Sequence, residues 1–174
     1  MKDYFAFIHE VVGAYFDRES ILAHKYFSDR SCIEVLEKLK KGMSTVHLLK
    51  KLDNIAWDMA APRFMEQLID TGGQGDYFVP FFLTLDKGLR EILSIHRIKG
   101  VIVNTNTGQL IPIPEISTLE YFESHGCKKE IEYFFCDNVK NERLSRPKST
   151  RISIHKNIKI EYDALRKTIR QSAK

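Results

Sequence analysis

Two aspartates and a threonine occupy positions where α/β proteins place metal ligands. Thr84 and Asp86 end a short apolar run that begins at Phe78, and Asp58 lies at the start of an earlier predicted helix. α/β proteins bind ligands and metal ions at the edge formed by the carboxyl ends of their strands. Two carboxylates that converge there would offer the oxygen ligands preferred by Mg²⁺ and Mn²⁺. The pattern therefore predicts that Asp58 and Asp86 share a divalent ion, with Thr84 beside it.

A second role is open for the same aspartates, because both stand where a predicted helix begins and aspartate is a preferred N-cap residue. Glu66 follows Asp58 by eight residues, which is about 80° around an ideal helix. It could lean toward the metal site as a further catalytic acid, or form a salt bridge with Arg63 three residues earlier. Glu10, in a predicted helix near the N-terminus, is the last candidate metal ligand.

Three short motifs follow one another between residues 50 and 95. They read Asn54-x-x-Trp57-Asp58, Arg63-x-x-Glu66 and Phe82-Leu-Thr84-Leu-Asp86-Lys-x-Leu89. Together they resemble the C-terminal half of the PIN-like ribonucleases. The resemblance implies that Asp58 and Asp86 match the third and fourth metal-binding acids of the family, and Thr84 the hydroxyl before the last acid. It also implies a Mg²⁺- or Mn²⁺-dependent hydrolysis of single-stranded RNA.

The first part of that family pattern is missing. The family opens with a strand that ends in its first metal-binding aspartate, whereas residues 3–16 predict an amphipathic helix. Glu10 is the residue that would take the place of the second acid. We therefore expect a PIN-like endoribonuclease domain that is intact, degenerate or incomplete, with a protein partner or a second copy completing the site. The alternative is a non-catalytic protein-interaction or nucleic-acid-binding regulatory module, in which the aspartates only cap helices.

Positive charge is concentrated near the C-terminus. Residues 138–174 carry eleven Lys and Arg against three Asp and Glu, whereas the first 137 residues carry 16 against 20. A basic arm on a mildly acidic body is typical of a protein that contacts a polyanion, although a solvated basic surface would have the same composition. The predicted contacts to RNA are Arg143, Arg146, Lys148, Arg151, Lys156 and Lys159.

The predicted elements indicate an α/β protein whose helix-rich N-terminal half packs on a small, mostly parallel sheet, followed by β-hairpins and a terminal helix. The apolar or alternating runs predict strands at 78–85, 100–103, 109–113, 130–136, 151–155 and 158–161, and the last helix at 162–171. Residues 1–137 would form the PIN-like domain, and residues 138–174 the basic arm.

Composition excludes several classes of protein. The three cysteines form no CxxC pair and the six histidines form no metal-binding pattern, so structural zinc and a disulfide framework are not expected. No apolar run approaches the ~18 residues of a membrane span, and the N-terminal apolar run is broken by Asp3, His9 and Glu10, unlike a signal peptide. We therefore expect a cytoplasmic protein without membrane contact.

Overall fold

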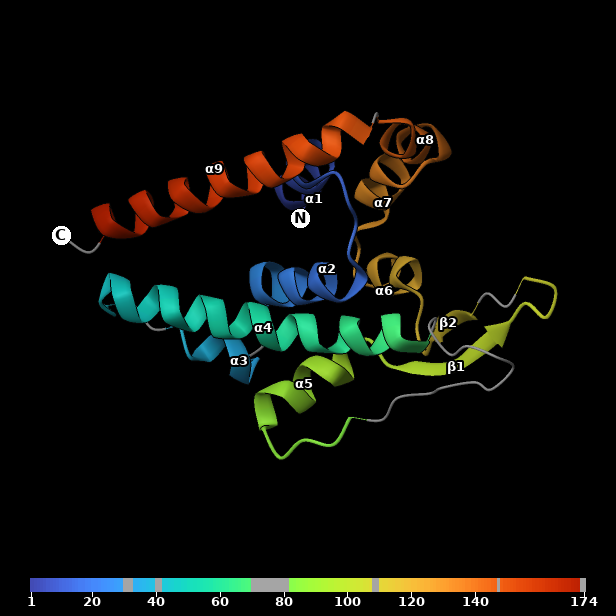
Figure 1. The fold of residues 1–174 in the computed structure, drawn as a ribbon, viewed down its shortest axis with the longest axis horizontal. Helices are drawn as coiled ribbons and strands as arrows, with labels where there is room; N and C mark the ends of the chain where they lie inside the picture. Colours follow the sequence, from blue (N-terminus) through green and yellow to red (C-terminus); the bar gives the residue numbers. More distant parts are fainter. Residues whose placement is uncertain (30–32, 40–41, 70–81, 108–109, 147, 173–174) are drawn as a thin grey trace.

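The computed structural model describes residues 1–29, 33–39, 42–69, 82–107, 110–146 and 148–172, without the side chains of 29, 67, 144, 148–155 and 172. Most of these residues are helical (Figure 1). The helices are α1 (Lys2–Phe7), η1 (Ile8–Val12), α2 (Asp17–His24), η2 (Lys25–Asp29), α3 (Glu34–Glu37), α4 (Thr45–Ile69), α5 (Lys87–Ile95), α6 (Thr118–Ser124), α7 (Lys128–Phe134), α8 (Asp137–Ser145) and α9 (Lys148–Ser172), and the strands are β1 (Ile98–Val103) and β2 (Leu110–Pro114). The π-helical turns η1 and η2 continue α1 and α2 directly.

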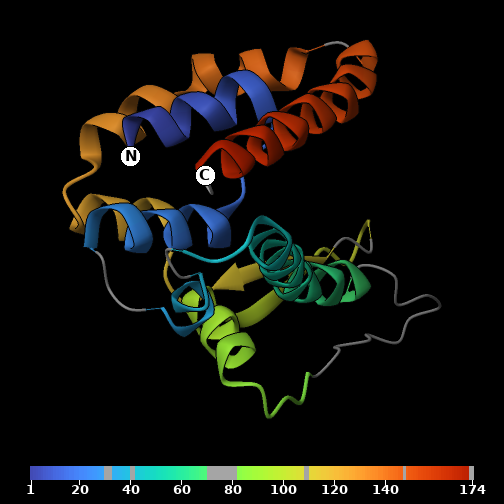
Figure 2. The same cartoon turned by 90° about the vertical axis from the view of Figure 1, so that its left-hand side faces the viewer.

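The helices form three levels, which both ribbon views show (Figure 2). α1, α7, α8 and α9 lie on one side, α2 and α6 lie in the middle, and α3, α4 and α5 lie on the other side with the hairpin. α2 contacts both α5 and α6, and α9 contacts both η1 and α4. The middle helices therefore connect the two outer levels. α9 lies in one outer level and also contacts α4 in the other.

Two hydrophobic clusters hold these levels together. The first joins α1, α2, α6 and α7 through Phe5, Ile21, Phe122, Cys127, Ile131 and Phe134. The second joins α3, α4 and α5 through Ile33, Val35, Ile55, Met59 and Ile92. Neighbouring residues of α2 serve both clusters, since Ile21 belongs to the first and Leu22 packs against the second. This helix is therefore fixed from two sides, which matters for the residues at its start.

The predicted mostly parallel sheet is wrong. In the described part of the chain the sheet consists of β1 and β2 alone, paired antiparallel with Ile102 opposite Ile111. That hairpin confirms the turn predicted around Asn104. Of the strand predicted at 78–85, residues 78–81 lie outside the described residues, and 82–85 have no regular structure. Leu83 and Leu85 are 97% and 93% exposed, so the apolar run that suggested a buried strand is not packed there.

The second predicted hairpin is also wrong, because residues 151–161 belong to the single long helix α9. The alternation of isoleucines suggested two strands, but the turn between them, Lys156-Asn157, lacks the glycine that favours a tight hairpin. In a helix, Ile158, Tyr162, Leu165 and Ile169 share one face at spacings of four, seven and eleven residues. The longer helical period therefore prevailed over the short alternation.

Residues 130–136 are likewise not a strand. They lie mostly in α7, where Ile131 and Phe134 are both buried. These two positions are three residues apart and so fall on the same helix face. The first residues of the predicted basic arm, 138–145, lie in α8. The division of the chain into domains at residue 137 stays a prediction.

Candidate functional site

Asp58 and Asp86 line one cavity of about 380 Å³ between α4 and the start of α5, so the two aspartates do come together. The same cavity is lined by Lys38 and Lys51. Two ammonium groups thus accompany two carboxylates in the same space. Lys51 also donates from Nζ to the backbone carbonyl of Lys38 at 2.7 Å, which ties the α4 lysine to the end of α3.

Asp86 caps α5. Its carboxylate accepts a hydrogen bond from the backbone N–H of Leu89 at 2.8 Å, and its own N–H donates to the hydroxyl of Thr84 at 3.1 Å. The bond from Leu89 lowers the pKa of Asp86, and the positive charge of Lys38 lowers it further. The capping role predicted as the alternative is therefore confirmed for Asp86, and Thr84 supports the same turn.

Asp58 does not cap a helix. A helix was predicted to begin at Asp58, but α4 runs without a break from Thr45 to Ile69 and places Asp58 in its interior, half-buried. Pro62 also lies inside this helix and is buried. Burial of Met59 and Pro62 against neighbouring elements outweighs the local tendency of proline to interrupt a helix. The sequence signal for a helix start at Asp58 was misleading for this reason.

Glu66 lies away from the two aspartates, in another cavity. Its Oε1 accepts from Nη2 of Arg18 at 2.7 Å, and the same Nη2 lies 3.2 Å from the backbone carbonyl of His96. Arg63 pairs instead with Glu19, at 2.5 Å between Nη2 and Oε2, and lies 3.8 Å above the ring of Phe16. Neither predicted role of Glu66 is realised, because its partner is Arg18. No local sequence pattern indicates that Arg18 is buried, so its pairing with Glu66 could not be predicted.

Glu10 lines a third cavity, of about 920 Å³, between α1 and the helices α7 and α8. Glu66 and Glu10 thus lie in cavities apart from the one that Asp58 and Asp86 share. Among the described residues, no three carboxylate, histidine or cysteine side chains lie close enough to hold a metal ion together. The pair at Asp58 and Asp86 is already accompanied by two lysines, so this donor set does not fit Mg²⁺ or Mn²⁺.

Two of the predicted RNA contacts are engaged inside the protein. Nη1 of Arg143 donates to the backbone carbonyl of Phe134 at 2.9 Å. Nη1 of Arg146 donates to the backbone carbonyl of His9 at 2.6 Å, and its Nη2 lies 3.4 Å from Oε1 of Glu142. These arginines hold α8 and the chain that leads into α9 against α7 and η1. Lys148 and Arg151 lie in α9, but their side chains are outside the described residues.

The remaining two, Lys156 and Lys159, are exposed on α9 and belong to a larger group. At 100° per residue, five basic side chains of this helix fall within an arc of about 100°. They are Lys156, Lys159, Arg166, Lys167 and Arg170, and all five are exposed. We call these five residues the basic stripe. Asp163 lies within the same arc, and the stripe keeps a net charge of +4.

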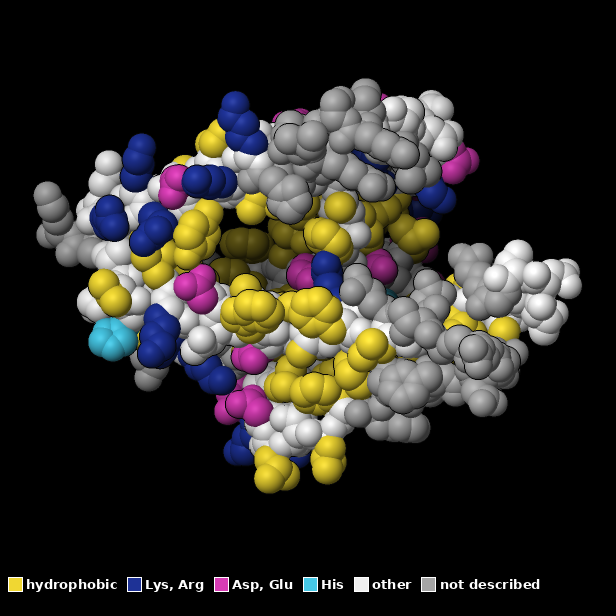
Figure 3. All heavy atoms as spheres, viewed as in Figure 1, with side chains coloured by type: hydrophobic (Ala, Val, Ile, Leu, Met, Phe, Trp, Pro, Cys, Tyr) yellow, Lys and Arg dark blue, Asp and Glu magenta, His cyan; other side chains and the backbone are white. Residues whose placement is uncertain are grey.

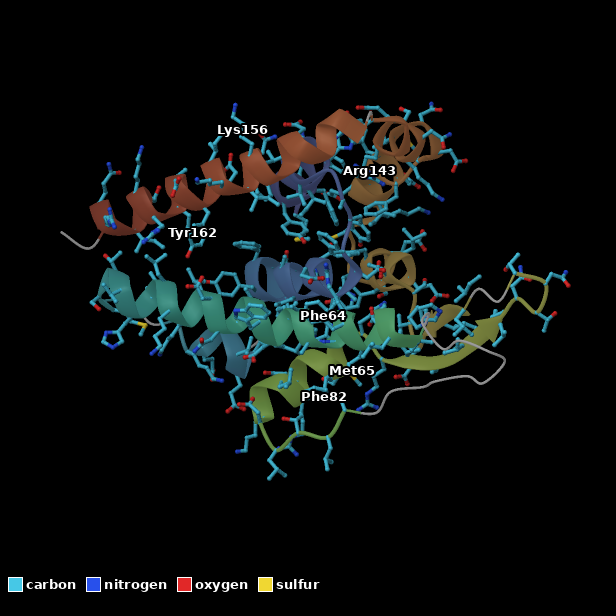
Figure 4. All side chains as sticks on the ribbon, in the orientation of Figure 1. Phe64, Met65, Phe82, Arg143, Lys156 and Tyr162 are labelled. Carbon is cyan, nitrogen blue, oxygen red and sulfur yellow. The ribbon has the colours of Figure 1, made fainter. Side chains whose placement is uncertain are left out.

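The opposite face of α9 turns toward the body of the protein. Figure 4 shows Lys156 directed away from the other helices and Tyr162 directed toward α4. The hydroxyl of Tyr162 donates to Oδ1 of Asp53 at 3.1 Å, which raises the pKa of the tyrosine. Figure 3 shows the dark blue side chains gathered along this part of α9. Residues 162–171 were predicted to form a helix, yet Arg166, Lys167 and Arg170 were not grouped with Lys156 and Lys159, because the hairpin prediction separated them.

The comparisons with known proteins found no match to this chain among family models, curated proteins or solved structures. Within the described part of the chain, no helix is both long and apolar enough to cross a membrane.

Proposed function

We propose that this chain is a non-enzymatic module that binds single-stranded RNA through the phosphate backbone. The basic stripe of α9 is the observation that carries the proposal. Five exposed cations on one face of one helix form a linear array of positive charge. Each Lys or Arg that approaches a phosphate releases a condensed counterion, which is the main source of affinity in binding that ignores sequence.

The dimensions of the stripe suit a short stretch of backbone. From Lys156 to Arg170 the helix rises about 21 Å at 1.5 Å per residue, enough to accompany several phosphates of an extended strand. Tyr162, the aromatic residue nearest to the stripe, is occupied with Asp53 and lies under the guanidinium of Arg166, with Cζ 5.7 Å from its ring centroid. Base stacking on this face is therefore weak, and we expect little preference for sequence.

The nuclease alternative has less support than the binding module. A metal-dependent nuclease needs carboxylates free to hold a cation, whereas Asp86 caps α5 and two lysines line the cavity that it shares with Asp58. The charges of that cavity compensate one another. The basic stripe has no such compensation beyond Asp163.

Fluorescence anisotropy of a labelled single-stranded RNA tests the proposal. The variant Lys159→Ala/Lys167→Ala/Arg170→Ala removes three charges of the stripe. Each lost phosphate contact should lower the logarithm of the affinity by about 0.7 at about 0.1 M salt. The variant should therefore bind about 100-fold more weakly at that salt concentration. The control Lys87→Ala/Arg90→Ala/Lys129→Ala removes three exposed charges from α5 and α7. It should keep most of the affinity. Equal losses in the two variants would contradict a specific role for α9.

A further inference from the structure

We propose a second binding site, separate from the basic stripe, where the start of α2 faces a cavity and receives a small compound bearing a carboxylate or phosphate group. The cavity measures about 380 Å³ and is lined by residues 15–19 together with Arg63, Glu66, His96, Leu110 and Pro112. It thus lies between α2, α4 and the β-hairpin. This inference does not depend on RNA binding by α9.

The start of α2 leaves backbone donors without a cap. Phe16 is the N-cap residue, with φ −134° and ψ 113°, and its side chain accepts no hydrogen bond. The N–H of Ser20 bonds to the carbonyl of Phe16, which leaves the amides of the three residues before it without an intrahelical partner. Such amides, with the positive end of the helix dipole, form a site that favours an anion.

Arg18 supplies an independent observation at the same cavity. Its side chain is only 5% exposed, and its Nε, which is buried, makes no hydrogen bond to any described residue. Nη2 is held by Glu66 and by the carbonyl of His96, so the guanidinium is fixed while the donor on Nε stays unused. Nε2 of His96 is also buried without a hydrogen-bond partner in the described part of the chain. A buried donor without a partner is costly, and a ligand oxygen in the cavity would satisfy it after a small shift of the side chain that carries it.

The acids around the cavity are already engaged. Oδ1 of Asp17 accepts from the hydroxyl of Thr118 at 2.6 Å. Glu19 forms an ion pair with Arg63, although its buried Oε2 makes no hydrogen bond in the described part of the chain, and Glu66 pairs with Arg18. What remains available is mainly donors: the first amides of α2, Nε of Arg18 and, in the tautomer protonated at Nε2, the imidazole of His96. This selection of groups favours an oxyanion over a cation or an amine.

The surrounding space indicates more than a bare ion. A second cavity of about 470 Å³ shares Arg18, Glu66 and His96 with the first. Its other walls include the apolar side chains of Met65 and Leu93. A ligand could therefore place its acidic group against α2 and a short apolar body between α4 and β1. We accordingly assign the pair of cavities to a small organic acid or phosphate ester.

The direct test is ¹H–¹⁵N NMR of the full chain during titration with inorganic phosphate, and separately with acetate, at constant ionic strength set by chloride. We expect saturable shifts of the Arg18 and Glu19 amides and of the Arg18 Nε–H. Saturation with phosphate alone would assign the site to phosphate esters, and saturation with acetate as well would extend it to carboxylates. Shifts that stay linear with both probes would overturn the proposal.

A pair of variants separates the site from general folding. Phe16→Ser supplies a hydroxyl that caps the amides of α2 from within, so phosphate should bind at least several-fold more weakly although the helix is better capped. Phe16→Ala removes the ring without adding a cap, and should keep the saturable shifts. Equal binding by both variants, or no binding by either, would contradict the role of the α2 amides. In the variant of α9 that lacks three charges of the stripe, the shifts should persist, which keeps this test distinct from that of RNA binding.

Discussion

The inner cavities and the outer face of α9 handle charge in opposite ways. Between α2, α4 and α5, acidic and basic side chains are brought together: Glu66 with Arg18, Glu19 with Arg63, and the two candidate aspartates with two lysines. Along α9, five cations stand exposed with one aspartate among them. Paired charges mainly serve stability and position, whereas a row of like charges on the surface is available to a partner. Variants of the paired inner charges should therefore change stability, whereas variants of the basic stripe should change RNA affinity.

The largest effect on stability should come from Glu66→Ala. It leaves the buried guanidinium of Arg18 without its carboxylate, which costs about 3 kcal/mol of the free energy of unfolding. Urea denaturation followed by circular dichroism measures this loss. The matched control is Glu132→Ala, which removes a carboxylate from an exposed pair with Lys128 at 3.9 Å and should change stability by less than about 1 kcal/mol. Similar losses in both variants would erase the distinction between paired inner charges and surface charges.

A smaller effect is expected from Asp86→Ala, because it removes the acceptor for the N–H of Leu89 at the start of α5. The melting temperature should fall, while Asp86→Asn should stay close to the parent because asparagine also caps helices. The opposite ranking of these two variants would show that the carboxylate does more than cap.

Asp86 should also make the stability of the folded chain depend on pH. The pKa of Asp86 is lower in the folded chain than its ordinary value, so its ionised form stabilises the folded state. This contribution is present above about pH 4, the ordinary pKa of aspartate, and is lost as the pH falls through the folded pKa. The difference in melting temperature between the parent and Asp86→Asn should therefore change below about pH 4 and stay constant between pH 5 and 8. A difference that changes only near neutral pH would contradict this assignment.

The smallest effect on stability should follow removal of charge from the basic stripe. Lys159→Ala/Lys167→Ala/Arg170→Ala touches exposed side chains only, and we expect a change within about 0.5 kcal/mol. The same protein should nevertheless lose most of its RNA affinity. A variant that unfolds instead would assign these residues to the structure of α9 rather than to a partner.

Some features of the fold could be predicted from local pattern, and others could not. The helix from Lys87 and the hairpin around Asn104 were found because each has strong local signals: an aspartate cap before an amphipathic segment, and a turn-rich stretch between apolar runs. The strand predicted at 78–85 rested on an apolar run, and such a run does not tell whether anything packs against it. In α9, the alternation of apolar and polar residues over 151–161 favoured strands, although the longer stretch has the period of a helix.

The candidate site shows the same limit. The meeting of Asp58 and Asp86 at one cavity was predicted, but the two lysines beside them were not, since Lys38 is brought there by the packing of α3 against α5. Arg18 and His96 are far apart in the sequence and meet only through the tertiary fold. The basic C-terminal charge was visible in the composition, whereas its alignment on one face required the helix to be known.

The salt dependence of RNA binding tests the central claim most directly. If the five cations of the stripe contact phosphates, the logarithm of the association constant should fall with the logarithm of salt concentration with a slope of about −3.5. In Lys159→Ala/Lys167→Ala/Arg170→Ala the slope should shrink to about −1.4 by the same relation. An affinity that does not change with salt, or an unchanged slope in this variant, would contradict binding of the RNA backbone by α9.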